Sequence, residues 1–285
     1  MQTKQTLSSE FVDLSEHFAR LCRFLYRDAT VIEKSAIELA EPYKTEEFWG
    51  VVAEPLRIGG SIKNIEVIPE IIEPGGSAMC GQAWDYESAL CDITSLYTFA
   101  LTRFMWSWVA FENLANRCCS NCQGRGVTGK AIEYMKNGNA INLIGLASCQ
   151  GLAIDLVEKQ IIECANRAAK RTDSERFLYI HLCREARNEL FHAHHKIIEP
   201  FYDEEDNLKL NNDSRVVLLE AMTRLTLLSI QSILGIYFRK STVLTGWLME
   251  SRGIPTSIEL SRVIEVLHLD NQSCVYQSQL EYNDA

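Results

Sequence analysis

Apolar residues recur at intervals of three and four along most of this 285-residue chain, which is the period of helices with one buried face. The pattern predicts an N-terminal helix, four long helices and a short tail helix. Their expected ranges are 9–40, 84–117, 140–171, 173–198, 213–240 and 258–267. Four long helices in succession with little strand signal predict an all-α protein built on a four-helix bundle.

The stretch from residue 42 to residue 82 differs from the rest of the chain. It contains four of the six prolines and two Gly-Gly pairs, which usually interrupt helices. We expect a loop here, with a short β-hairpin around the β-branched run 62–68. The chain then divides into an N-terminal helix with this segment (1–82), a helical bundle (83–245), and a short helix with a polar tail (246–285).

Composition narrows the function. Hydrophobic residues make up 47% of the chain and charged residues 23%, which is typical of a folded globular protein. Lys and Arg total 28 and Asp and Glu total 38, for a net charge of −10. A global basic surface for nucleic acid or acidic lipid is therefore excluded, and any such contact must be local.

No membrane segment is expected, because the longest charge-free apolar run, 225–238, is shorter than the roughly 20 residues that a span requires. The start of the chain lacks the apolar core of a signal peptide, so we expect a cytoplasmic protein. The ten cysteines are irregularly spaced within helical patterns, and this predicts buried thiols rather than a disulfide framework.

Two motifs resemble known sites without completing them. Cys119 and Cys122 have the C-x-x-C spacing of half a zinc site, but a closed site needs two more ligands. Residues 124–130, GRGVTGK, match the letters of a phosphate-binding loop. Ala131 replaces the hydroxyl residue that would hold Mg²⁺, and a helix rather than a strand precedes the motif. We therefore expect free thiols and a flexible loop.

The strongest signal lies between residues 181 and 195, which hold four of the six histidines. From residue 164 to residue 196, seven Lys/Arg stand against four Asp/Glu, so the segment is locally positive. On a helix, Arg184, Asn188 and His192 share one face. His181 and His195 extend that stripe. Arg187 lies 140° around the helix from His192, but its long side chain can reach the same polar face.

These residue types suit phosphoryl chemistry. A neutral imidazole can accept or donate a proton near pH 7, and a guanidinium binds phosphate oxygens and stabilises charge that develops on phosphorus. An amide one turn from His192 can orient it. Such a set can cleave RNA without a metal, because the 2′-hydroxyl supplies the nucleophile and a 2′,3′-cyclic phosphate results. A solvated polar helix face has the same spacing.

A resemblance adds to this interpretation. The sequence Arg187-Asn188-x-x-x-His192 is similar to the R-N-x-x-x-H motif of HEPN domains, and it lies near the end of the third predicted long helix. The aromatic segment 106–114 resembles the opening helix of HEPN proteins from prokaryotic defence and toxin systems. The resemblance covers residues 84–240 and leaves the first 80 unexplained.

HEPN membership would imply a metal-independent endoribonuclease without a cofactor, acting as a homodimer whose two protomers line one cleft. Arg187 would hold the scissile phosphate, His192 would handle protons, and Asn188 would orient one of them. Glu112, Arg184 and His195 are auxiliary candidates. RNA would be the substrate, and an antitoxin or another defence protein would be a possible partner.

Two alternatives remain open at this stage. The first is a non-catalytic HEPN-like module that binds a partner protein or a nucleotide. The second is a regulator stabilised by zinc at Cys119 and Cys122. His192→Ala separates the enzyme from the module, and a metal analysis tests the regulator.

Overall fold

The computed structural model describes residues 11–29, 44–68, 81–140, 143–160, 162–171, 175–192, 201–202, 208–209, 214–239, 242–244 and 257–270. Helices dominate these residues, which confirms the predicted all-α class. The α-helices are α1 (Leu14–Arg23), α3 (Lys44–Ser61), α5 (Gly81–Cys118), α6 (Gly126–Asn137), α7 (Leu146–Gln160), α8 (Ile162–Ala169), α9 (Leu178–His192), α10 (Ser214–Tyr237) and α11 (Leu260–Glu265).

The remaining described elements are short. A π-helical turn, η1 (Phe24–Ala29), continues α1, and a 3₁₀ turn, η3 (Glu175–Phe177), precedes α9. Two antiparallel strand pairs involve two or three residues per strand. They are β1 (Phe201–Tyr202) with β2 (Leu208–Lys209), and β3 (Thr242–Leu244) with β4 (Ser257–Glu259).

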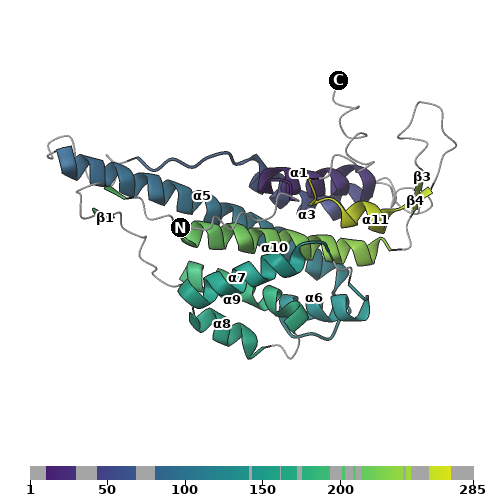
Figure 1. The fold of residues 1–285 in the computed structure, drawn as a ribbon. Coiled ribbons are helices and arrows are strands. Elements are labelled where there is room, and N and C mark those ends of the chain that lie inside the picture. The colour runs from purple at the N-terminus through teal and green to yellow at the C-terminus, as the bar shows by residue number, and fades with distance from the viewer. Residues whose placement is uncertain are drawn as a thin grey trace, which may run out of the picture.

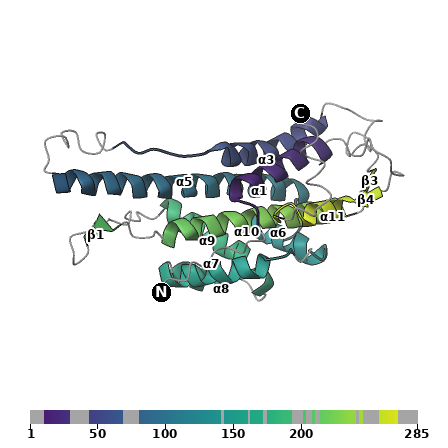
Figure 2. The same cartoon turned by 45° about the horizontal axis from the view of Figure 1, so that its top comes forward.

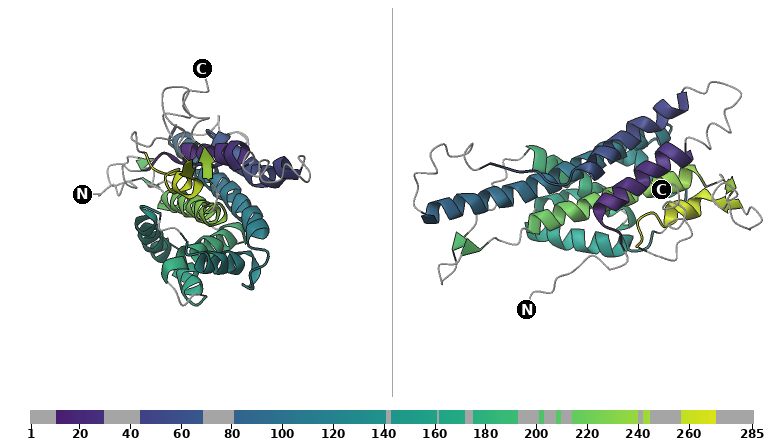
Figure 3. Two further views of the ribbon diagram at one scale, coloured as in Figure 1. Left: turned by 90° about the vertical axis from the view of Figure 1, so that its right-hand side faces the viewer. Right: turned by 90° about the horizontal axis from the view of Figure 1, so that it is seen from above.

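Helix α10 runs through the middle of the molecule, beside the C-terminal half of α5 (Figure 1). Helices α1, α3 and α11 lie on one side of this pair, and α6, α7, α8 and α9 lie on the other (Figures 1 and 2). The N-terminal half of α5 extends beyond the end of α10 in both views. Seen along the bundle, the helices surround α10 (Figure 3).

The central position of α10 explains its composition. Among the described helices it alone is long and apolar enough to cross a membrane, but 83% of that window is buried inside the protein. Its residues contact helices on both sides, so an apolar stripe on a single face would leave polar groups in the core. The apolar run around 225–238 is therefore that of a core helix.

Part of the predicted loop at 42–82 is wrong, because α3 occupies residues 44–61. Pro55 lies inside this helix and cannot donate to the carbonyl of Val51. The side-chain amide of Asn113 on α5 donates to that carbonyl instead, at 2.8 Å. The described residues 62–68 form neither helix nor strand, so the hairpin expected there is also absent.

Close packing of three helices explains why a glycine, Gly59, lies within α3. A Cβ on Gly59 of α3 would lie 2.7 Å from the ring of Phe18 on α1 and 3.1 Å from Trp106 on α5. Three helices therefore meet where only glycine leaves enough room. One apolar core joins α1 and α3 to the bundle helices, while the domain boundaries at 82 and 245 stay predictions.

Three further predicted ranges are corrected. Helix α6 begins at Gly126, inside the motif 124–130 that is expected to form a flexible loop. The single helix expected over 140–171 is two helices, α7 and α8, and it starts later because Asn139 and Gly145 both have positive φ angles. The third long helix starts later than predicted, since the 3₁₀ turn η3 precedes α9 at Leu178, while the predicted end at 193–198 lies outside the described residues.

A buried chain of hydrogen bonds ties both ends of the described chain to α10. Arg224 donates to Nδ1 of His17 at 2.9 Å, and Nε2 of His17 contacts Oε1 of Gln231 at 3.0 Å. The amide of Gln231 then donates to Nδ1 of His268 at 2.9 Å, and Nε2 of His268 contacts the carbonyl of Ile144 at 2.9 Å. Each imidazole therefore accepts at Nδ1 and donates at Nε2, which is the neutral form.

Candidate functional site

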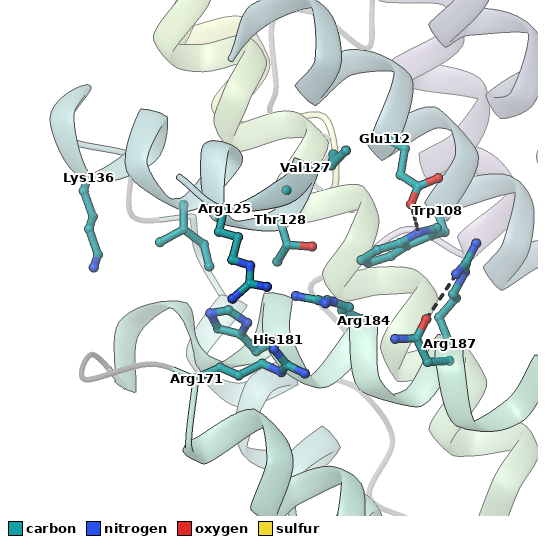
Figure 4. A pocket seen from close by; sticks show the side chains of 14 residues that line it. Trp108, Glu112, Arg125, Val127, Thr128, Lys136, Arg171, His181, Arg184 and Arg187 are labelled. Carbon is teal, nitrogen blue, oxygen red and sulfur yellow. Dashed lines mark hydrogen bonds between the residues drawn. The ribbon is translucent and has the colours of Figure 1, made fainter. Parts of the chain in front are cut away.

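A pocket of about 900 Å³ opens between α5, α6 and α9 (Figure 4). Most of its polar lining comes from α9 and from the start of α6, and Arg171 follows the end of α8. The lining residues are Trp108, Glu112, Arg125, Gly126, Val127, Thr128, Gly129, Ile132, Lys136, Arg171, His181, Arg184, Arg187 and Asn188.

Three of these residues come from the predicted stripe on α9. His181, Arg184 and Asn188 line the pocket together, as their helical spacing predicts. Arg187 also lines it, although it lies off that stripe. The predicted helix therefore forms one wall of the pocket.

Arg187 and Asn188 of the motif are in direct contact. The Nη1 group of Arg187 donates to Oδ1 of Asn188 at 3.1 Å, and the Nε–H of Arg187 is buried without a partner (Figure 4). His192 is the final residue of α9, one turn beyond Asn188, and its side chain lies outside the described residues. His195 lies wholly outside them, so its predicted role is untested.

The start of α6 forms the opposite wall of the pocket. Residues 126–129, its first turn, all line the cavity, and no side chain caps this turn. Main-chain N–H groups in the first turn of a helix lack helical partners and attract anions. A Cβ on Gly124 would overlap the backbone of Gly129, so glycine allows the preceding loop to fold back against α6.

The pocket is strongly positive, although the protein carries −10 overall. Five of its lining residues are cations, namely Arg125, Lys136, Arg171, Arg184 and Arg187, and Glu112 is the single acidic one. Their formal sum is +4. Apart from Arg171, none of these cations forms an ion pair with a carboxylate in the described part of the chain.

His181 lies among these cations. It is 7% exposed, and its Nδ1 atom has no hydrogen-bond partner. Burial lowers the pKa of His181, and the charges of Arg184 and Arg171 lower it further. The imidazole is therefore neutral at pH 7, with one N–H to donate and one nitrogen to accept.

An ion-pair network outside the pocket holds α8 against α9. Arg167 contacts Glu185 at 3.0 Å and Glu189 at 2.6 Å, and Arg171 contacts Glu185 at 2.8 Å. Glu185 is only 3% exposed. Since a buried carboxylate needs such partners, this network positions α9 and orients Arg171 at the edge of the pocket.

Glu112 is fixed by a neighbour on its own helix. The indole Nε1 of Trp108 donates to its carboxylate at 2.7 Å, and both side chains line the pocket (Figure 4). Glu112 therefore lies where α5 faces the pocket. Its auxiliary role in chemistry stays a prediction.

The two cysteines of the C-x-x-C motif follow the end of α5 and are not among the residues that line the pocket. Burial raises the pKa of Cys119 to about 12 and also raises that of Cys122, so both thiols stay protonated at pH 7. Within the described ranges, no cluster of three or more His, Cys, Asp or Glu side chains could hold a metal ion.

Arg125, Lys136 and Arg171 line the pocket but are not among the site residues predicted from the sequence. Arg125 lies inside the glycine-rich motif 124–130. The sequence pattern therefore marks this segment, but the prediction made from it is a flexible loop. The correct interpretation is an uncapped helix start. Lys136 and Arg171 carried no recognisable signal, because they join the pocket only through the packing of α6 and α8 against α9.

Comparisons with known proteins add no relative. No protein-family model matches the chain, and neither a curated protein nor a solved structure is significantly similar to it.

Proposed function

We propose that this protein is a metal-independent endoribonuclease with a HEPN-like bundle, in which Arg187, Asn188 and His192 act on one phosphodiester. The observation that carries the proposal is the concentration of five cationic side chains on a single pocket of a strongly acidic protein. The pocket contains two of the three motif residues. A protein with a large negative net charge is not expected to concentrate cations at one site by chance.

In the proposed reaction, His192 removes the proton of the ribose 2′-hydroxyl. The resulting oxygen attacks phosphorus, the bond to the 5′ oxygen breaks, and the products are a 2′,3′-cyclic phosphate and a 5′-hydroxyl. The leaving oxygen takes a proton from a second imidazole, which a homodimer would supply. Arg187 stabilises the charge on the phosphoryl oxygens, and its unpartnered Nε–H is available for one of them.

Asn188 has two roles open to it in this scheme. Its Oδ1 atom accepts from Arg187, which limits the rotation of the guanidinium, and its amide N–H₂ group can donate to a phosphate oxygen. The net charge of −10 opposes general RNA binding, so we propose a specific structured RNA or a partner that controls access. A cytoplasmic toxin or anti-phage effector, restrained by an antitoxin, fits this requirement.

The alternative is a non-catalytic module that binds a nucleotide. The first turn of α6 favours it, because this turn lines the pocket independently of the motif and attracts phosphate without any chemistry. Catalysis and binding would then differ at His192 alone.

Cleavage of a mixed RNA pool in EDTA tests the proposal. We expect the wild type to cut and to leave cyclic-phosphate ends, and His192→Ala to be inactive while it keeps its fold and oligomeric mass. Equal cutting by both proteins would refute the role of the motif. Binding of nucleotides without cutting, by both proteins, would support the module instead.

A further inference from the structure

The pocket carries more positive charge than one phosphodiester can balance. Its formal lining charge of +4 comes from five cations and one carboxylate, and the partial positive charge of the α6 N-terminus adds to it. One phosphodiester contributes a single negative charge. Even after Arg171 is neutralised by Glu185, a charge of about three units remains to be matched.

The cations occupy two ends of the cavity. Figure 4 shows Arg187 beside Trp108 and Glu112 at one end, and Arg125, Arg171 and His181 at the other, with Arg184 between them. The first end contains the motif. The second contains no residue of the motif, and its Arg125 directly precedes the first turn of α6, whose residues also line the pocket.

His181 gives independent support for a ligand at the second end. Its ring points toward the guanidinium of Arg125 (Figure 4), it is 7% exposed, and its Nδ1 atom has no partner. A buried polar atom without a partner costs roughly 1–3 kcal/mol. The positive charges of Arg184 and Arg171 also act on this ring. An anion bound beside it would offset the repulsion between these charges and could accept a hydrogen bond from the unpartnered nitrogen.

The volume agrees with a ligand larger than a free ion. Pockets for small molecules measure roughly 300–1,000 Å³, and this one has about 900 Å³. A single inorganic phosphate would leave most of that space unfilled. A short piece of polynucleotide, with one phosphate at each end of the cavity, uses both its length and its charge.

We propose that the α6 end of the pocket is a second phosphate subsite, formed by the first turn of α6 with Arg125, Arg171, His181 and Arg184, and that it holds the phosphate next to the scissile one. The inference rests on the proposed function for the identity of the first phosphate. It assigns the substrate class as a strand with at least two phosphates in the pocket, and it makes Arg125 a residue for binding rather than for cleavage.

Binding of dinucleotides that cannot be cut tests this subsite. The probes lack the 2′-hydroxyl and carry an internal phosphate alone, or an additional terminal phosphate at the 5′ or the 3′ end. We expect one of the two phosphorylated probes to bind the wild type at least about tenfold more tightly than the unphosphorylated probe, because two to three charge-assisted hydrogen bonds are added.

Variants locate the effect. Arg125→Ala should abolish the gain from the terminal phosphate and leave the affinity for the unphosphorylated probe nearly unchanged. Arg125 is exposed and makes no capping hydrogen bond, so its removal does not threaten the fold. The matched control is Lys63→Ala, which removes one exposed charge from the segment after α3 and should retain the full gain.

Two results would overturn the subsite: no gain with either phosphorylated probe, or a gain that persists in Arg125→Ala. The salt dependence gives a second readout, since loss of one phosphate contact lowers the slope of log K against log salt by about 0.7 on single strands. A phosphate gain in a protein that never cuts RNA would support the subsite and refute the nuclease, so the two failures are distinguishable.

Discussion

The side-chain amide of Asn113 on α5 takes the place of a missing helical hydrogen bond at Val51 on α3. Pro55 has no N–H for the Val51 carbonyl, and Asn113 donates to it at 2.8 Å. A proline within α3 is therefore compatible with the helix because another helix satisfies the exposed acceptor.

This relationship predicts a specific coupling between two substitutions. Asn113→Ala should lower the free energy of unfolding by about 1 kcal/mol, since the Val51 carbonyl loses its partner. In a Pro55→Ala background the helix supplies an N–H to that carbonyl, and the same substitution should cost less. Urea denaturation of the four proteins measures the coupling, and equal costs in both backgrounds would contradict it.

Two glycines of α3 should respond oppositely to alanine. Gly59→Ala should destabilise the protein by about 1–3 kcal/mol, because the new methyl group would overlap Phe18. Gly50→Ala meets nothing within 4 Å and should stabilise the helix by up to about 1 kcal/mol. Thermal unfolding of both variants checks the prediction, and similar shifts in Tm would argue against the close contact at Gly59.

Loss of Glu185 should destabilise the junction of α8 and α9. Glu185→Ala leaves Arg171 without its carboxylate partner and Arg167 with one fewer, and we expect a cost of about 3 kcal/mol for breaking a buried ion pair. Glu163→Ala is the control, because that carboxylate is 79% exposed and contacts Arg167 at only 3.6 Å. Its effect should stay below about 0.5 kcal/mol, as measured by denaturant unfolding.

Stability should fall as the pH is lowered from 7 to 5. Burial lowers the pKa of His268 to about 4 and that of His17 well below 6.5, and nearby Arg224 and Arg20 lower both further. The unfolded chain binds more protons between these values, so folding stability is present above pH 6.5 and is lost toward the folded pKa. His268 alone should account for about 2 kcal/mol between pH 7 and pH 5.

Geometry explains the direction of this effect, since a proton on Nδ1 of His268 would face the N–H₂ of Gln231. The test compares the unfolding free energies of the wild type and His268→Asn at both pH values. The variant should show a weaker pH dependence. If its pH dependence equals that of the wild type, His268 does not carry the effect.

The proposed chemistry requires the shape of an arginine at position 187. Arg187→Lys keeps the charge but loses the planar fork that can bind two phosphate oxygens, so we expect kcat/KM for RNA cleavage to fall at least about tenfold. Arg57→Lys, on the exposed surface of α3, is the matched control and should leave kcat/KM unchanged. Full activity of Arg187→Lys would remove Arg187 from the proposed mechanism.

Periodicity predicted the helices whose cores are apolar and continuous. The ranges 84–117 and 213–240 agree with α5 and α10 to within a few residues at each end. The two helices mistaken for loops contain Pro55, Gly59 or Gly126, whose local preferences are outweighed by contacts with other helices. A sequence pattern does not include those contacts, so α3 and α6 were mistaken for loops.

The site was predictable to the extent that it lies on one helix. Arg184 and Asn188 were identified from their spacing on α9 and Arg187 from the R-N-x-x-x-H resemblance, and all three line the pocket. Arg125 and Arg171 join them from α6 and from the end of α8, and only the packing of those helices creates the second cationic end of the cavity.

Hydrogen bonds between the two ends of the described chain also bear on the order in which the protein folds. Arg20 near the start donates to the carbonyl of Leu269 near the end, across 249 positions of sequence, and Val12 pairs with the main chain of His268. Closing so long a loop gains little until α10 has already formed a surface for both segments. The first and last described helices should therefore dock late in folding and detach together, as one cooperative unit, before the core around α10 opens.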